Sequence, residues 1–175
     1  MSEDRVYKLI APQAGFIRSK AKYPAYVASW GTGKSLALIA RAVKESETYP
    51  GNLGVIFRKE FTDLRDSTLR DFELYTGMKA TSERSVKFGN GSEILFRHLE
   101  EMNNIQNMNL GWFGIEQAEE LETDDQFLKL WGRLRRDNTS RSGFVIANTN
   151  GDNWIYKLWK IVNDQDYENF EANSF

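Results

Sequence analysis

The sequence contains no cysteine, and among its 175 residues there are only one histidine and three prolines. Without cysteine the chain has no disulfide framework and no thiolate ligand for a metal. The single histidine, His98, leaves too little for zinc catalysis or for a Ser-His-Asp triad. Disulfide bonds, thiolate metal sites, zinc catalysis and a Ser-His-Asp triad are therefore excluded.

The sequence also lacks any apolar run near the ~20 residues that a membrane-spanning helix needs, and its start lacks the basic and apolar regions of a signal peptide. We therefore expect a cytoplasmic protein without membrane contact. The net charge of −2 gives no overall attraction to nucleic acid, although Arg133, Arg135 and Arg136 form a local basic strip. What the chain does contain is 41% hydrophobic residues, enough for the core of one globular domain.

Apolar runs alternate with segments of helical spacing along the chain. The apolar runs lie at residues 24–29, 54–57, 111–115 and 144–147. The segments with helical spacing between them lie at 35–46, 61–72 and 127–134. Strands that alternate with helices predict an α/β fold with a mainly parallel central sheet flanked by helices. Asn90-Gly91 lies between two runs of alternating polarity, which predicts an antiparallel hairpin within or beside that sheet.

Residues 28–35 read Ala-Ser-Trp-Gly-Thr-Gly-Lys-Ser and end like the phosphate-binding loop G-x-x-x-x-G-K-[ST]. In such a loop the backbone N–H groups and the following helix N-terminus bind phosphate oxygens. The predicted nucleotide-binding residues are Ser29, Trp30, Gly31, Thr32, Gly33, Lys34 and Ser35. Lys34 would reach the β and γ phosphates of ATP, and the Ser35 hydroxyl would hold Mg²⁺.

The alternative for this stretch is a strand-to-helix turn that carries a solvated lysine. The strand before the loop and the helix after it favour the phosphate site, because the mechanism requires that context. Ala28 replaces the usual first glycine. Alanine adds one methyl group, and a strand-like φ at position 28 would not need glycine.

An apolar run ends in Glu116, which is followed by Gln117 and then by Glu119 and Glu120. Ligands of open α/β sheets bind at the carboxyl ends of strands, so we expect Glu116 near the phosphate loop and assign it to Mg²⁺. Gln117 interrupts the usual pair of adjacent acids, so the base that activates water is either Glu116 or Glu119. The alternative, that the acids begin a solvated helix, suits Glu119 and Glu120 better than Glu116.

The last of the four apolar runs, residues 144–147, is followed by Asn148, Thr149 and Asn150, and then by Gly151. Amide and hydroxyl groups at that edge of the sheet can sense the γ-phosphate through hydrogen bonds. A plain turn rich in asparagine and glycine is an equally good interpretation of this stretch alone.

Taken in order, these motifs resemble the ATPase part of the large terminase subunit of tailed bacteriophages. The resemblance covers most of the chain. It is carried by Ala11-Pro-Gln13-Ala-Gly-Phe16, the phosphate loop, Ile56-Phe-Arg-Lys59, Leu64-Arg-Asp-Ser67, Asn90-Gly-Ser92, Gly114-Ile-Glu-Gln-Ala-Glu-Glu120, Gly132-Arg-Leu-Arg135 and Asn148-Thr-Asn-Gly151 with Trp154.

The resemblance implies a P-loop NTPase of the additional-strand catalytic glutamate type. It implies that Gln13 contacts adenine within an N-terminal lead, residues 1–23, that precedes an ATPase core at 24–175. Asn148, Thr149 and Asn150 would form the motif that couples hydrolysis to DNA movement. Only 24 residues follow Gly151, so we expect the family's C-terminal nuclease domain to be absent.

Many members of the family carry an arginine within the phosphate loop, where this sequence has Trp30. A charge-neutralising arginine must then come from elsewhere in the chain or from a neighbouring subunit. The candidates are Arg97, Arg133, Arg135 and Arg136. For each of them taken singly, a surface salt bridge is the competing role.

The resemblance also implies partners: double-stranded viral DNA, the portal and procapsid, and the small terminase subunit, with the motor assembled as a ring on the portal in the host cell cytoplasm. As an isolated domain we expect a monomer. Two alternatives stay open, a helicase-like DNA-dependent ATPase and a nucleotide-binding module with little turnover. Gln117, at a place where a catalytic acid often lies, motivates the second.

Overall fold

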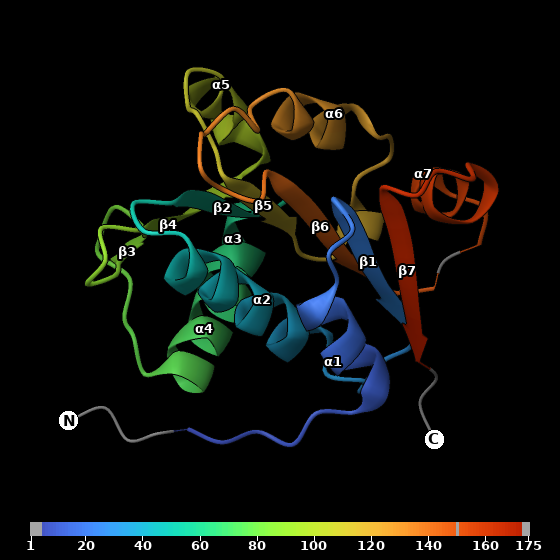
Figure 1. The fold of residues 1–175 in the computed structure, drawn as a ribbon, viewed down its shortest axis with the longest axis horizontal. Helices are drawn as coiled ribbons and strands as arrows, with labels where there is room; N and C mark the ends of the chain where they lie inside the picture. Colours follow the sequence, from blue (N-terminus) through green and yellow to red (C-terminus); the bar gives the residue numbers. More distant parts are fainter. Residues whose placement is uncertain (1–4, 150, 173–175) are drawn as a thin grey trace.

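The strands form one central sheet in the computed structural model, which describes residues 5–149 and 151–172. Within those residues the sheet has seven strands in the order β3-β4-β2-β5-β6-β1-β7 (Figure 1). Their bounds are Tyr23–Ala28 for β1, Leu53–Arg58 for β2, Ser85–Lys87 for β3, Glu93–His98 for β4, Trp112–Ile115 for β5, Ser142–Ala147 for β6 and Tyr167–Ala172 for β7. All neighbouring pairs are parallel except β3 and β4, which confirms the predicted α/β fold with its hairpin.

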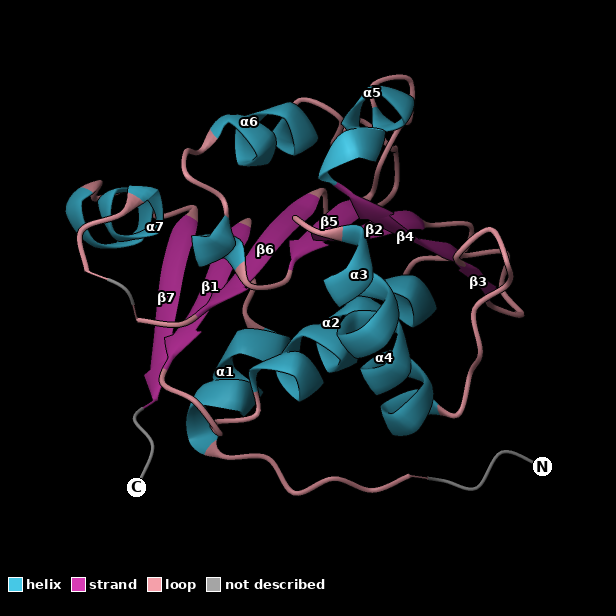
Figure 2. Ribbon diagram, turned by 180° about the vertical axis from the view of Figure 1, so that it is seen from behind, coloured by secondary structure: helices cyan, strands magenta, loops and turns pink. Residues whose placement is uncertain are grey.

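Helices cover both faces of the sheet (Figures 1 and 2). One face carries α1 (Ala11–Arg18), α2 (Lys34–Thr48), α3 (Phe61–Asp63) and α4 (Leu69–Thr76), with a π-helical turn, η1, at Leu64–Thr68. The other face carries α5 (Met102–Ile105), α6 (Asp125–Trp131) and α7 (Trp154–Tyr156), and a second π-helical turn, η4, at Lys157–Ile161. Short 3₁₀ turns, η2 at Leu99–Glu101 and η3 at Ala118–Glu120, follow β4 and β5. In the described part of the chain, no helix has the length and apolar character needed to cross a bilayer.

The strands bury side chains on both faces, because successive residues of a strand point to opposite sides. Trp112 packs toward α2 and stacks on Phe144 with ring centroids 5.5 Å apart. The next residue, Phe113, packs on the other side and meets Phe127 of α6 edge-on. The two cores fix the register of the sheet, since a one-residue slip would exchange their contents.

The strand order places β6 between β1, which leads into the phosphate loop, and β5, which ends at Glu116. β6 is thus the additional strand of the predicted fold class. The carboxyl ends of these three parallel strands lie at one edge of the sheet, where α/β folds bind ligands.

Several elements were not predicted from the sequence, among them α1, α5, α7 and β7. Residues 11–18 form α1, which packs on α2, and residues 167–172 form β7, which pairs with β1 along its whole length. The sequence of β7 does not indicate a strand, because this half-buried edge strand contains several polar residues and lacks a clear apolar pattern. The division of the chain at residue 23 remains a prediction.

Candidate nucleotide-binding site

The phosphate loop connects β1 directly to α2. Gly31 and Gly33 have φ angles of 75° and 72°, in the left-handed region that favours glycine. Ala28 is the last residue of β1 and pairs with Ala172, so its backbone belongs to a strand. The alanine therefore does not disturb the loop, as the sequence predicted.

Side chains brace the loop from within. The Tyr26 hydroxyl donates to the Thr32 carbonyl at 2.8 Å, and the Thr32 hydroxyl donates to the Ser29 carbonyl at 2.7 Å. Lys34 lies across the loop, with its Nζ donating to the carbonyls of Ala28 at 3.1 Å and Ser29 at 2.6 Å. These bonds hold the lysine at the position where a phosphate-binding loop needs its positive charge.

Burial lowers the pKa of Lys34, and the charge of Glu119 opposes that shift. The interaction places the Glu119 carboxylate in the electrostatic reach of the lysine. Trp30, by contrast, is 76% exposed at the tip of the loop, so it offers an aromatic surface to solvent and no charge.

Gln13 lies against the phosphate loop from α1. Its Nε2 donates to the Gly33 carbonyl at 2.9 Å, and its Oε1 accepts from the Ile10 N–H at 2.9 Å. A Cβ at position 33 would lie 2.1 Å from that Nε2, so only glycine allows this approach. The residue expected from the family resemblance to contact adenine is thus at the loop, with its amide engaged.

Glu116 joins the loop to its surroundings. It is 3% exposed, directly after β5, and its backbone N–H donates to the Phe57 carbonyl of β2 at 2.9 Å. Its Oε1 accepts from the Ser35 hydroxyl at 2.9 Å, and its Oε2 accepts from the Thr68 hydroxyl. Burial raises the pKa of Glu116, whereas the bonds from Thr68 and Ser35 and the nearby charge of Arg58 oppose that rise.

Glu119 and Gln117 meet the end of β6 through Asn148. The Asn148 amide donates to Glu119 Oε1 at 2.8 Å and to Gln117 Oε1 at 3.1 Å. The other oxygen of Glu119, Oε2, is buried and has no hydrogen-bond partner among the described residues. Burial also raises the pKa of Glu119, and Gln117 has a φ of 52°, the kind of strained backbone that occurs at functional sites.

Arg58 is the charged residue that sequence reasoning missed. It ends β2, beside β5, and is 6% exposed, with Nη2 3.4 Å from Glu120 Oε1 and Nη1 3.5 Å from Thr68 Oγ1. The signal was available: Ile56-Phe-Arg58 is an apolar run that ends in an arginine at the carboxyl edge of the sheet.

The four arginine candidates are engaged elsewhere in the chain. Arg97 donates to the carbonyls of Glu83, Arg84 and Phe96 and lies 3.9 Å from Glu101. Arg133, Arg135 and Arg136 donate to carbonyls of Gln106, Gly132, Asn109 and Gly51. The loops holding Asn109 and Gly51 precede β5 and β2, so these three arginines lie at the amino edge of the sheet, opposite the phosphate loop.

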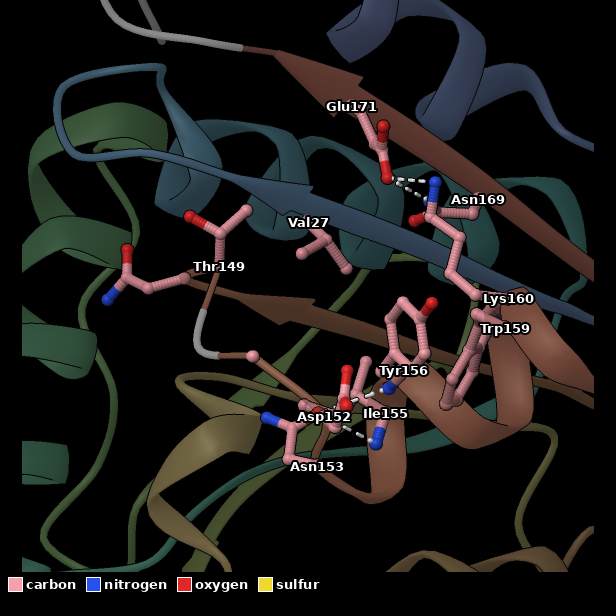
Figure 3. A pocket seen from close by; sticks show the side chains of 12 residues that line it. Val27, Thr149, Asp152, Asn153, Ile155, Tyr156, Trp159, Lys160, Asn169 and Glu171 are labelled. Carbon is pink, nitrogen blue, oxygen red and sulfur yellow. Dashed lines mark hydrogen bonds and ion pairs between the residues drawn. The ribbon is translucent and has the colours of Figure 1, made fainter.

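A cavity of about 300 Å³ lies beside Asn148 and Thr149, which the family resemblance predicts to couple hydrolysis to movement. It is bordered by the ends of β1 and β6, the α7–η4 segment and β7 (Figure 3). Val27, Trp159 and Tyr156 give it apolar walls, and Thr149 reaches its rim. Asn148 thus bonds Glu119 and Gln117, while the next residue borders this cavity. Asn150, the third residue of the predicted coupling motif, lies outside the described residues.

The oxygen atoms of Ser35 and Glu116 suit Mg²⁺, a hard cation that takes one or two protein ligands and completes its shell with water and phosphate oxygens. The described residues include no group of three or more acidic or histidine side chains that could cage an ion alone.

A glycine loop between a strand and a helix, with a lysine, a serine and a strand-end glutamate converging on it, defines a P-loop nucleotide-binding protein. The family model "Phage terminase large subunit" matches residues 20–174. The chain therefore belongs to the phage terminase large subunit family. A search of curated protein sequences finds no match.

Solved structures agree with this assignment. The large terminase ATPase domain of Thermus phage P74-26 is 18% identical, with a TM-score of 0.68 over 95% of this chain and 81% of that one. The large terminase of a thermophilic bacteriophage, in complex with ATP-γ-S, is 11% identical, with a TM-score of 0.75 over 94% of this chain and 44% of that one. The Phi-28 gp11 DNA-packaging motor is 13% identical, with a TM-score of 0.55 over 90% and 58% of the two chains. At such identities these likenesses show the fold, and this chain spans less than half of the terminase solved with ATP-γ-S.

Proposed function

We propose that this chain hydrolyses ATP to ADP and phosphate with Mg²⁺, and that the reaction powers translocation of double-stranded DNA into the procapsid. The observation that carries the proposal is the hydrogen bond between Ser35 and Glu116, which joins the phosphate loop to the end of β5 across the sheet. The structures of related terminases and of a packaging motor support the wider role.

The loop residues 29–33 would surround the phosphates with backbone N–H groups, and Lys34 would exchange its loop carbonyls for β and γ phosphate oxygens. Ser35 and Glu116 would hold Mg²⁺, which neutralises the charge that develops on the phosphates. Gln13 lies on α1 and bonds the Gly33 carbonyl, so its side-chain amide is close enough to the loop to contact the adenine of a bound ATP.

Glu119 is the better candidate for the base that activates water. Both oxygens of Glu116 accept hydrogen bonds from side chains, whereas one oxygen of Glu119 is buried without a partner among the described residues. That oxygen belongs to the carboxylate whose charge acts on Lys34. Glu116 would therefore be a ligand of the metal, and Glu119 would be the general base that activates water.

Asn148 would move when Glu119 moves during hydrolysis, because its side-chain amide donates a hydrogen bond to the Glu119 carboxylate. Thr149 borders the cavity against α7 and η4, so a shift of the Glu119 loop would reach that segment. This is the path by which Asn148, Thr149 and Asn150 would couple hydrolysis to movement.

The completing arginine would come from a neighbouring subunit if it is Arg133, Arg135 or Arg136, since these lie at the opposite edge of the same chain. This supports a ring assembled on the portal, with the small terminase subunit as a further partner and the host cytoplasm as the location. The chain alone would be a monomer, in which an N-terminal lead, residues 1–23, precedes the core at residues 24–175.

A phosphate-release assay with purified protein tests the proposal. We expect phosphate to be produced from ATP in the presence of Mg²⁺ and production to stop when EDTA is added, because Ser35 and Glu116 cannot replace the metal's charge. DNA and procapsid should raise the rate. Continued hydrolysis in EDTA would contradict the assignment of the metal ligands. Tight ATP binding without turnover, even with procapsid present, would favour the nucleotide-binding module that Gln117 suggests.

The variant Glu119→Gln tests the identity of the base. We expect kcat to fall by ~10²- to 10⁴-fold, the usual contribution of general base catalysis, while the affinity for ATP and Mg²⁺ is kept. Glu122→Gln is the matched control, because Glu122 lies three residues further along the same segment and is exposed to solvent. If kcat for Glu119→Gln is within threefold of the control, Glu119 is not the general base and Glu116 becomes the candidate for that role.

A further inference from the structure

Glu116 is held from two sides by elements far apart in the sequence. One oxygen bonds Ser35 at the start of α2, and the other bonds Thr68, which lies 48 residues away and is 1% exposed. Because both bonds are inside the protein, the carboxylate cannot turn without losing one of them. Ser35 and Glu116 are the two proposed metal ligands, whereas Thr68 is not a metal ligand and its bond to Glu116 needs another explanation.

The local backbone brings Thr68 into this position. Thr68 ends η1, and the N–H of the next residue, Leu69, donates to the Leu64 carbonyl, the spacing of a π-helical turn. A single π turn between α3 and α4 changes which face of the helix its residues occupy, and such turns occur frequently at functional sites. Here the turn directs a hydroxyl into the sheet edge, in a segment whose neighbouring residue Asp66 pairs with Arg65 at the surface.

Arg58 completes the arrangement. Its Nη1 lies 3.5 Å from Thr68 Oγ1 and its Nη2 lies 3.4 Å from Glu120 Oε1, so the guanidinium spans the gap between η1 and η3. The Arg58 Nε is buried with no partner in the described structure. Burial disfavours the charged form of the carboxyl groups that follow β5, and the nearby positive charge of Arg58 favours it.

We propose that Thr68 and Arg58 are positioning residues that keep the Glu116 carboxylate turned toward Ser35, so that the ligand pair for Mg²⁺ is assembled before nucleotide arrives. The inference rests on the proposed function, in which Ser35 and Glu116 hold the metal. Neither residue touches the nucleotide in this account. They act through Glu116, and their loss should slow the reaction more than it weakens binding.

The first measurement is steady-state hydrolysis by Thr68→Val, which keeps the shape of threonine and removes the donor. We expect kcat to fall about 10- to 100-fold, the effect of losing one hydrogen bond to a charged group, with KM for ATP within threefold of wild type. Thr68→Ser restores the hydroxyl and should recover most of the rate. Thr76→Val is the matched control, because that hydroxyl at the end of α4 donates to the Phe72 carbonyl and accepts from the Met78 N–H, without contact to Glu116. Equal kcat for Thr68→Val and Thr76→Val would overturn the proposal.

The second measurement needs no turnover. In a crystal structure of nucleotide-free Thr68→Val we expect the Glu116 carboxylate to have rotated away from Ser35, whereas in Thr68→Ser it should stay. Unchanged bonding of Glu116 to Ser35 in Thr68→Val would contradict the proposal even if wild type does not hydrolyse ATP. Inactive wild type with a displaced Glu116 in the variant would instead contradict the proposed function alone.

Arg58→Gln gives an independent test should Thr68→Val fail to fold. It removes the charge between η1 and η3 and leaves Thr68 in place. We expect the same pattern, a lower kcat with a nearly unchanged KM and a displaced Glu116, while thermal unfolding confirms that the protein is folded. Wild-type kcat in folded Arg58→Gln would exclude Arg58 from the positioning role.

Discussion

Replacing Glu116 with glutamine is expected to lower kcat for ATP hydrolysis by about 10³-fold and to leave nucleotide binding largely intact. Glutamine has nearly the same shape, so Thr68 and Ser35 can still donate to its remaining oxygen or turn aside. What is lost is the negative charge that would hold Mg²⁺, and a metal contributes several kcal/mol to stabilising the charge of the transition state.

Phosphate release and binding of a fluorescent ADP analogue, measured on the same preparation, separate these effects. Glu122→Gln is the control, because Glu122 follows the same loop and is exposed to solvent. Raising Mg²⁺ should partly restore the rate of the variant, since the missing carboxylate weakens metal affinity. If Glu116→Gln retains more than a third of the wild-type kcat, Glu116 does not hold the metal.

Replacing Lys34 with alanine is expected to abolish both tight ATP binding and hydrolysis. Lys34 is the charged side chain within the loop, and in the present structure it bonds the carbonyls of Ala28 and Ser29. Its loss removes the positive charge facing the β and γ phosphates, and removing one such preorganised group lowers rates by ~10²- to 10³-fold. Weaker binding adds to that loss at low ATP concentration.

Isothermal titration with ATP-γ-S and a phosphate-release assay measure the two losses. Lys44→Ala is the matched control, because Lys44 lies later on the same α2 helix and donates to the Ile17 carbonyl of α1. The control should bind and hydrolyse like wild type. Equal rates for Lys34→Ala and Lys44→Ala would rule out the phosphate site at this loop.

The order of elements could be predicted because each signal is local. Asn90-Gly91 predicted the β3–β4 hairpin, and the loop between residues 28 and 35 predicted the strand before it and the helix after it. β7 could not be predicted in the same way. It becomes a strand through its pairing with β1, since its own residues are only half buried and carry little apolar pattern.

The candidate site shows the same division. Glu116 was predicted near Ser35 because a strand end and a phosphate loop share one edge of an α/β sheet. The arginine candidates were chosen by charge alone, and the structure places three of them at the opposite edge. Arg58 was passed over, although it lies one strand from Glu116, because its neighbour in space depends on the order of β2 and β5.

The sequence by itself determined that this chain contains a phosphate loop, because glycine, lysine and serine act through the backbone of a short segment. It also determined an α/β fold and an acidic strand end. Only the tertiary structure decided which side chains hold that acid. The contact between Thr68 and Glu116 depends on the strand order and on one π-helical turn, and neither is recorded in the spacing of residues along the chain.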